Sequence, residues 1–213
     1  MSRRSLPFEI SGGFGVDKTF PGLTQQENSE GQIWLEFIRG SDHAIGWIYR
    51  AYANKLYNYG RQFTRNENLV LDAVQDVFLG LIKNRKNLGL AVSIKFYLYA
   101  SLRRNLLRQL KRNEKIILKE KILDEDTFIL SIDSNPLSLN PFYSSDQKRI
   151  IEQVCNRLPD NQREALVLYY LEGFSYKEIA EIMKLSTVKS VRAMVYRALD
   201  SLSDTLSRWK DRL

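Results

Sequence analysis

Hydrophobic side chains recur every three or four residues along most of the stretch 33–112, and no alternation of period two competes with them. Four apolar stripes follow one another there, and a break at 84–92 separates the third from the fourth. Asn66 precedes the third stripe, where its side chain can accept hydrogen bonds from the first amides of a helix. The pattern therefore predicts four helices and no strands in this part of the chain.

A second helical unit runs from residue 147 onward. Pro159 and Asp160 favour a helix start and Gly173 favours a helix end. Acidic residues, prolines and serines between the two units indicate a linker, and the first residues of the chain lack periodicity. We expect an all-α fold of two small helical domains joined by a flexible linker. Its parts are a flexible tail (1–31), a first domain (32–112), the linker (113–146) and a second domain (147–213).

The second domain contains the features of a helix-turn-helix. Ser175 and Glu178 have the spacing of a capping box, and Ala180 is small where two helices would approach closely. The next helix has an apolar face, while Lys189 and Arg192 point elsewhere. This arrangement can place side chains in a DNA major groove. An ordinary helical hairpin with solvated basic residues accounts for the segment equally well.

The charge of the chain indicates an anionic partner. The formal net charge is +7 and the isoelectric point is about 9.4. Eight basic residues and only two acidic ones lie between Arg103 and Lys121. Phosphate contacts made by lysine and arginine supply most of the affinity for nucleic acids, although an acidic protein surface would also fit.

No arrangement of residues indicates catalysis. Cys155 is the only cysteine and His43 the only histidine, so neither a disulfide within the chain nor a zinc site of the usual kinds is expected. No apolar run approaches the length of a membrane span. We expect a cytoplasmic protein that is not an enzyme, with no metal, no cofactor and no small-molecule substrate.

The third and fourth helices each have a face that could bind a partner. On the third, the residues outside the buried stripe form an acidic strip with one exposed leucine, which suits a basic protein surface but also a solvated face. On the fourth, Phe96, Tyr97 and Tyr99 precede a run of arginines. Aromatic rings and cations together can hold single-stranded bases, although at least one of the three rings is expected in the core.

Several motifs, in this order and spacing, resemble those of the extracytoplasmic-function (ECF) sigma factors of bacterial RNA polymerase. Residues 72–79 read DAVQDVFL, similar to the DLVQEVFL-type helix with which that family binds core polymerase. Residues 97–105 read YLYASLRRN, similar to the start of its promoter-melting helix. Residues 171–180 read LEGFSYKEIA and residues 196–199 read YRAL, which closely resemble its C-terminal domain.

The resemblance implies an alternative sigma factor that directs core RNA polymerase to specific promoters and assists melting of the −10 element. Its partners would be the β′ clamp helices of core polymerase, promoter DNA and an anti-sigma factor. The first domain would correspond to sigma region 2 and the second to sigma region 4. Contacts with polymerase would involve Asp72, Gln75, Asp76 and Leu79; contacts with the −10 element Asn87, Phe96, Tyr97, Arg103, Arg104 and Arg108; contacts with the −35 element Ser175, Lys177, Lys189, Ser190, Arg192, Tyr196 and Arg197.

Two other classes of protein remain as alternatives. A stand-alone helix-turn-helix regulator would use the first domain for ligand sensing or dimerisation, but this leaves the acidic strip and the aromatic-basic helix unexplained. A decoy that mimics a sigma surface would occupy a protein partner, but the intact cationic helix argues against it.

Overall fold

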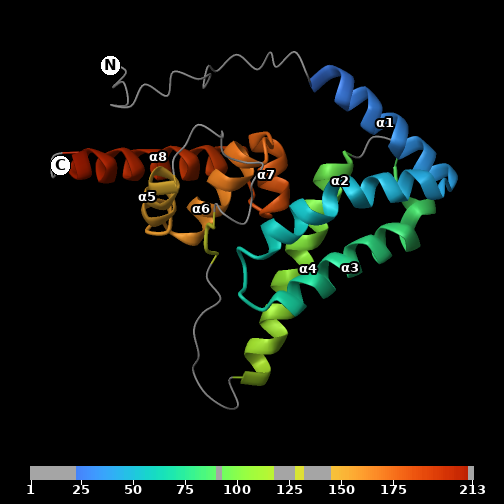
Figure 1. Ribbon diagram of the computed structural model, residues 1–213, viewed down its shortest axis with the longest axis horizontal. Coiled ribbons are helices and arrows are strands. Elements are labelled where there is room, and N and C mark those ends of the chain that lie inside the picture. Colours follow the sequence, from blue (N-terminus) through green and yellow to red (C-terminus); the bar gives the residue numbers. More distant parts are fainter. Residues whose placement is uncertain (1–22, 90–92, 118–127, 132–144, 211–213) are drawn as a thin grey trace.

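The computed structural model describes residues 23–89, 93–117, 128–131 and 145–210, and within these ranges the chain forms helices and no strands (Figure 1). The predicted all-α fold is confirmed. In none of the described helices is a stretch both long enough and apolar enough to cross a membrane. The elements are α1 (Leu23–Arg39), α2 (Asp42–Gly60), α3 (Glu67–Asn84), η1 (Arg85–Asn87), α4 (Ile94–Ile117), α5 (Ser145–Cys155), α6 (Asp160–Leu166), η2 (Val167–Leu171), α7 (Tyr176–Ile182) and α8 (Val188–Lys210).

The first domain is a bundle of α1 to α4 in which α2 packs against each of the others. Its core consists of the predicted apolar stripes, from Trp34 in α1 to Leu110 in α4. Gly60 ends α2 at a close approach, since a Cβ there would lie 2.7 Å from a methyl carbon of Val70 on α3. The Asn66 side chain accepts from the Leu69 amide at the start of α3, which confirms the predicted cap.

The first helix begins earlier than predicted. Residues 1–31 were expected to form a tail because they lack hydrophobic periodicity, but α1 starts at Leu23. This stretch contains glutamine and glutamate, which favour a helix even where no apolar stripe is present. A tertiary contact also favours the helix, since the Tyr52 hydroxyl on α2 donates a 2.6 Å hydrogen bond to Glu30. Residues 1–22 of the predicted tail lie outside the described residues.

The second domain packs α5, α6 and α7 against the long helix α8 (Figure 1). The predicted start of α6 after Pro159 is confirmed, and α6 continues into the π-helical turn η2. Gly173, with φ +70°, ends that turn in a left-handed conformation that favours glycine. The capping box of α7 is also confirmed: Ser175 and Glu178 each satisfy a backbone amide of the other.

The turn between α7 and α8 is a Schellman motif. The Leu185 amide donates to the Ala180 carbonyl at 2.8 Å, and the Lys184 amide donates to the Glu181 carbonyl at 3.3 Å. Lys184 occupies the left-handed position of this motif with φ +54°, where glycine is the usual residue. Thr187 then caps α8, because its hydroxyl oxygen accepts from the Ser190 amide. These caps fix the angle at which α8 leaves α7.

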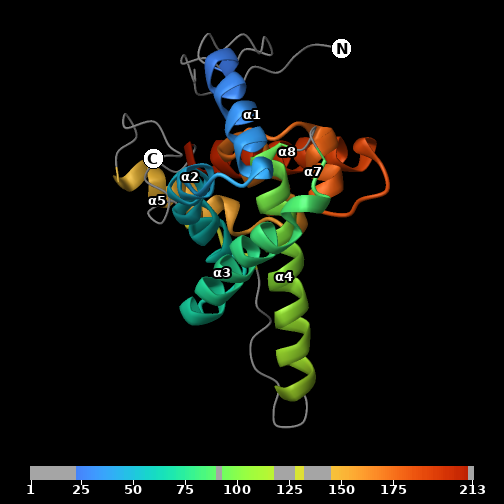
Figure 2. The ribbon, with the colours of Figure 1, turned by 90° about the vertical axis from the view of Figure 1, so that its right-hand side faces the viewer.

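The two domains contact each other directly. Helix α4 of the first domain packs against α7 of the second, and buried side chains from both domains form one continuous cluster. Residues 128–131 are the described part of the predicted linker, and Phe128 and Leu130 are buried in the same cluster. Beyond this contact the C-terminal part of α4 projects away from the other helices (Figure 2). Residues 118–127 and 132–144 of the predicted linker lie outside the described residues.

Candidate functional site

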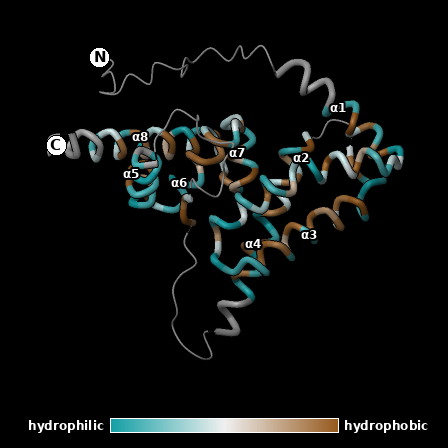
Figure 3. The backbone as a smooth tube through the Cα atoms, viewed as in Figure 1, coloured by the Kyte–Doolittle hydropathy of each residue, from teal (hydrophilic) through white to brown (hydrophobic). Residues whose placement is uncertain are grey.

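The exposed face of α3 carries all four residues predicted to bind polymerase. Asp72, Gln75, Asp76 and Leu79 are exposed. The opposite face of the helix, which includes Val74 and Phe78, is buried. Figure 3 shows long hydrophobic stretches along α3. Some of the apolar side chains of α3 face solvent, which is unusual for a helix that already buries a complete apolar stripe.

Three exposed apolar side chains beside this strip were missed by the sequence analysis. Leu71 and Ile82 on α3 are 53% and 47% exposed, and Tyr49 on α2 is 55% exposed. The Tyr49 ring packs on the Phe78 ring with centroids 4.9 Å apart. Leu71 and Ile82 could have been found because they fall outside the spacing of the buried stripe, but Tyr49 is brought there only by the packing of α2 on α3.

One predicted polymerase contact is also part of a hydrogen-bond network inside the domain. The buried Asn105 amide on α4 donates to Asp76 at 3.2 Å. The Asn105 carbonyl oxygen accepts in turn from Arg108 at 3.0 Å. The network therefore connects the exposed strip of α3 with a predicted strand-binding arginine of α4.

The aromatic residues at the start of α4 have different environments. Tyr99 is fully buried, which confirms the expectation that one of the three rings is in the core, whereas Phe96 and Tyr97 are half-buried. The Tyr97 ring lies 6.3 Å from the ring of Trp34, whose indole N–H donates to the Gly89 carbonyl at 2.9 Å. Through Trp34, these contacts bring Gly89, which lies shortly after η1, close to the start of α4.

The other residues predicted to contact the −10 element lie on η1 and along α4. Arg108 donates to Asn105, and the side chains of Asn87, Arg104 and Arg108 are all exposed. Arg103 is not: its side chain is only 14% exposed and forms a bidentate ion pair with Glu164 of the second domain, at 2.6 and 3.1 Å. Glu164 also accepts a 2.7 Å hydrogen bond from the Tyr59 hydroxyl on α2.

Burial and pairing shift the pKa values of these groups. Burial raises the pKa of the Tyr59 hydroxyl well above its usual value, and the nearby Glu164 carboxylate raises it further. Burial alone would lower the pKa of Arg103, but the hydrogen bond and charge of Glu164 outweigh this, so the pKa is raised. The guanidinium therefore stays charged and bound to Glu164 at neutral pH.

A second carboxylate, Glu172, forms a similar contact with Lys95 and Tyr99, nearer the start of α4. The Tyr99 hydroxyl donates to it at 2.5 Å, and the Lys95 ammonium lies 4.0 Å from the same oxygen while donating to the Glu172 backbone carbonyl. The Lys95 ammonium also lies 4.8 Å from the ring centroid of Phe174. Burial raises the pKa of Glu172 and lowers that of Lys95.

On the helix-turn-helix, most predicted residues form an exposed cationic surface. The exposed members are Lys177, Lys189, Arg192, Tyr196 and Arg197. Ser175 and Ser190 are half-buried and engaged in helix caps: the Ser175 hydroxyl lies 2.6 Å from the Glu178 carboxylate, and Ser190 pairs with Thr187 at 2.9 Å. Their hydroxyls fix the ends of α7 and α8, so a ligand would have to compete with these contacts.

Tyr176 is a further member of this surface that the sequence analysis missed. Its ring stacks on Tyr169 with centroids 4.5 Å apart and an interplanar angle of 3°. The Arg192 guanidinium lies over the Tyr176 ring, 5.5 Å from its centroid. Because a cation over an aromatic face is attracted to it, Tyr176 restricts where Arg192 can point. The motif shows an aromatic residue after the cap, but only the packing of α8 shows its partner.

The described residues contain no group of histidine, cysteine, aspartate and glutamate side chains that could hold a metal ion. Cys155 is buried, and burial raises the pKa of its thiol to about 11, so it is a packed side chain rather than a reactive one.

Comparison with known proteins identifies both domains. Residues 48–116 match the family model for sigma-70 region 2, and residues 148–202 match the model for sigma-70, region 4. The chain is 26% identical over 164 residues to the ECF RNA polymerase sigma factor SigM of Bacillus subtilis, covering 77% of this chain and 96% of SigM. It is 27% identical over 176 residues to the ECF RNA polymerase sigma-E factor of Haemophilus influenzae, covering 79% and 90%.

The fold is similar to that of a solved sigma factor. The structure of RpoE from Bartonella quintana, in complex with the anti-sigma factor NepR, superposes with a TM-score of 0.58 at 20% identity, covering 75% of this chain and 94% of that one. Regions 2 and 4 match in their expected order, and both relatives are matched over almost their whole length. The chain belongs to the ECF sigma factors, the alternative sigma factors that act in transcription initiation.

Proposed function

We propose that this sigma factor divides its work among three surfaces. The exposed acidic and apolar face of α3 binds core RNA polymerase, the start of α4 and η1 binds the −10 element, and the cationic face of α7 and α8 binds the −35 element. The chemistry of RNA synthesis belongs to the polymerase, and the sigma factor contributes binding alone. The observation that carries the proposal is that one chain combines an exposed acidic and apolar face on α3 with a capped helix-turn-helix whose cationic side chains are exposed.

The composition of the α3 face suits a stable protein interface. Leu71, Leu79 and Ile82 supply exposed apolar area, and Asp72 and Asp76 supply negative charge beside it. A few well-packed residues near the centre give most of the binding energy at such interfaces, while charges steer the encounter. A basic partner surface with an apolar centre, such as the β′ clamp helices, would fit this face.

The α4 surface suits an opened DNA strand. Phe96 and Tyr97 are half-buried rings at the start of the helix, and Arg104 and Arg108 are exposed cations farther along it. Rings provide stacking surfaces for unpaired bases, and arginines contact the phosphates between them. Asn87 on η1 is exposed and would contact a base edge at the end of the strand.

The helix-turn-helix suits duplex DNA. Lys189 and Arg192 lie in the first turns of α8, the part of a recognition helix that reaches base edges in the major groove. Lys177 and Arg197 extend the positive surface and would contact phosphates. Since the structure of RpoE contains an anti-sigma factor, we include such a protein among the partners of this chain.

The test of this function is binding to core RNA polymerase followed by promoter-directed transcription. The purified protein is expected to comigrate with bacterial core polymerase on size exclusion at moderate salt, and the holoenzyme is expected to initiate at a defined set of genomic promoters. Retention of duplex DNA binding without comigration would overturn the proposal and indicate a stand-alone regulator.

Replacement of Tyr176 by leucine tests the recognition surface. We expect Tyr176→Leu to weaken binding of the holoenzyme to its −35 element about threefold, because the loss of an exposed cation–π contact costs about 0.5–1 kcal/mol. Tyr176→Phe keeps the ring under Arg192 and is expected to bind like the wild type. Filter binding to matched promoter fragments measures both. Equal loss in the two variants would show that the hydroxyl, and not the ring, is the important group.

A further inference from the structure

Helix α1 packs against the segment that carries Asn87. This segment, residues 85–89, comprises η1 and the two residues after it, and α1 contacts η1 directly. Asn87 is exposed, whereas Arg85 before it and Leu88 after it are half-buried. The segment is therefore covered at its flanks and open at Asn87, the residue proposed to contact a base edge of the −10 element.

The first end of the segment rests on the turn between α1 and α2. Gly40 follows α1 in a left-handed conformation with φ +102°, and the Ser41 amide donates to the Glu36 carbonyl at 3.0 Å. The Arg85 guanidinium lies against this turn, because a Cβ at Gly40 would be 3.4 Å from its nearest nitrogen. Glycine gives the turn its backbone angle and lets the guanidinium lie directly on the backbone.

The second end of the segment is bound by Trp34 of α1. The indole N–H donates to the Gly89 carbonyl at 2.9 Å, and the Trp34 side chain is 1% exposed. The Phe37 ring, about one turn farther along α1, packs on the indole with ring centroids 5.6 Å apart. A buried ring packed against a second ring has little freedom to change rotamer, so the N–H keeps its direction toward Gly89.

Trp34 also contacts the other half of the surface proposed to bind the −10 element. The Tyr97 ring at the start of α4 lies 6.3 Å from the indole, with an interplanar angle of 49°. One side chain therefore sets the position of Gly89 relative to Tyr97. It thereby also fixes where Asn87 stands relative to a ring on which a neighbouring base would stack.

We propose that Trp34 and Arg85 are positioning residues for the −10 element, which hold residues 85–89 on α1 so that Asn87 meets an unpaired base without a change in the backbone. This inference rests on the proposed role of Asn87 and the start of α4 in strand binding. A segment that already has its bound conformation loses less conformational freedom on binding. The apparent affinity for the correct base therefore rises with the fraction of molecules in that conformation.

The experiment measures base discrimination by the holoenzyme. Fluorescence anisotropy gives the dissociation constants for single-stranded oligonucleotides that carry the −10 element of one mapped promoter, with each base in turn at each position. The Asn87→Ala variant identifies the position that Asn87 reads, because discrimination is lost there. We expect Trp34→Phe and Arg85→Gln to reduce discrimination at this same position about threefold, as for a segment that is correctly placed about a third of the time.

Matched controls separate positioning from the loss of a charge or of an indole. Lys86→Gln removes a positive charge one residue from Arg85, and Trp47→Phe removes a half-buried indole from α2. Both controls are expected to discriminate between bases like the wild type. In the Asn87→Ala background, Trp34→Phe is expected to cause no further loss of discrimination, because the residue that it positions is absent.

The possible outcomes distinguish this inference from the proposed function. Trp34→Phe is expected to fold, which thermal unfolding checks, since the exposed Gly89 can bind water in place of the indole. Wild-type discrimination in both Trp34→Phe and Arg85→Gln would overturn the inference alone. Uniform weakening for all bases in Arg85→Gln would make that residue a phosphate contact and overturn its positioning role. Discrimination that survives Asn87→Ala at every position would refute the proposed base contact, and the inference with it.

Discussion

Replacement of Leu79 by arginine is expected to abolish stable binding to core RNA polymerase while leaving the fold intact. Leu79 is 53% exposed at the centre of the α3 face, between the apolar Ile82 and the acidic Asp76. An arginine there removes an apolar anchor and adds positive charge opposite a basic partner. We expect Leu79 to be one of the few residues whose loss at an interface costs about 2 kcal/mol or more, which is about 30-fold in the dissociation constant.

The matched control is Leu35→Arg, since Leu35 is also a partly exposed leucine but lies on α1. Titration of labelled core polymerase measures both variants, and thermal unfolding checks that each is folded. Normal assembly of Leu79→Arg would show that the α3 face is only solvated. Asp76→Arg is also expected to prevent holoenzyme formation, but it is a less selective test. It would remove the side-chain acceptor of the buried Asn105 amide, whose other acceptor is the Ala73 carbonyl at 3.5 Å, and thereby disturb α4.

The sequence was most informative where structure is determined by neighbouring residues. The caps at Asn66 and Ser175 were predictable because a capping side chain bonds to an amide only three residues away. The apolar stripes predicted the buried faces of α3 and α4, because residues three or four apart lie on the same face of a helix and that face packs against the core. The residues of α3 that fall outside its apolar stripe were therefore predicted to form the exposed strip.

The contact between the domains could not be predicted in this way. Arg103 and Glu164 are 61 residues apart, and Tyr59 and Glu164 are 105 residues apart, so no local pattern relates them. Phe128 lies in a stretch whose composition indicated a linker, and only its packing against Phe63 shows that it belongs to the core. Arg103 was therefore predicted as a free DNA contact, although it is an interdomain ion pair in the described structure.

The start of α1 could not be found from periodicity either. A helix that begins with polar residues has no apolar stripe to reveal it, and helix propensity alone is a weak signal. The contact from Tyr52 to Glu30 is again tertiary.

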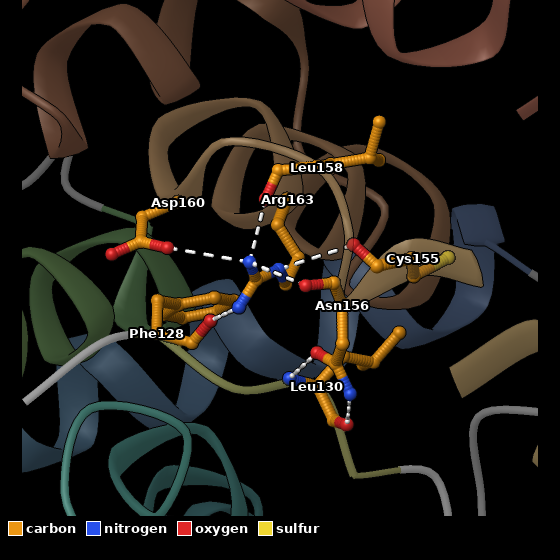
Figure 4. A network of polar contacts seen from close by, with 7 residues as sticks. All are labelled: Phe128, Leu130, Cys155, Asn156, Leu158, Asp160 and Arg163. Carbon is orange, nitrogen blue, oxygen red and sulfur yellow. Dashed lines mark hydrogen bonds and ion pairs between the residues drawn. The ribbon is translucent and has the colours of Figure 1, made fainter. Parts of the chain in front are cut away.

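Replacement of Arg163 by methionine is expected to be the most destabilising substitution considered for this protein. The Arg163 guanidinium is buried and donates to the carbonyls of Cys155, Asn156 and Leu158 at 3.2, 3.2 and 2.5 Å, as well as to that of Phe128 (Figure 4). Methionine fills similar space but donates no hydrogen bond, so these carbonyls would lose their charged donor. A buried acceptor left without its donor costs about 1–3 kcal/mol, so the loss at several carbonyls is expected to total about 3–5 kcal/mol.

Urea unfolding measures this loss as a change in the free energy of unfolding. Arg157→Met is the control because Arg157 is an exposed arginine in the turn between α5 and α6. We expect the control to stay within about 0.5 kcal/mol of the wild type. A loss below about 1 kcal/mol in Arg163→Met would mean that water can replace the guanidinium at these carbonyls. Arg163→Met removes the donor that joins the end of α5 to α6 within the second domain, so we expect the loss to appear in the unfolding of that domain.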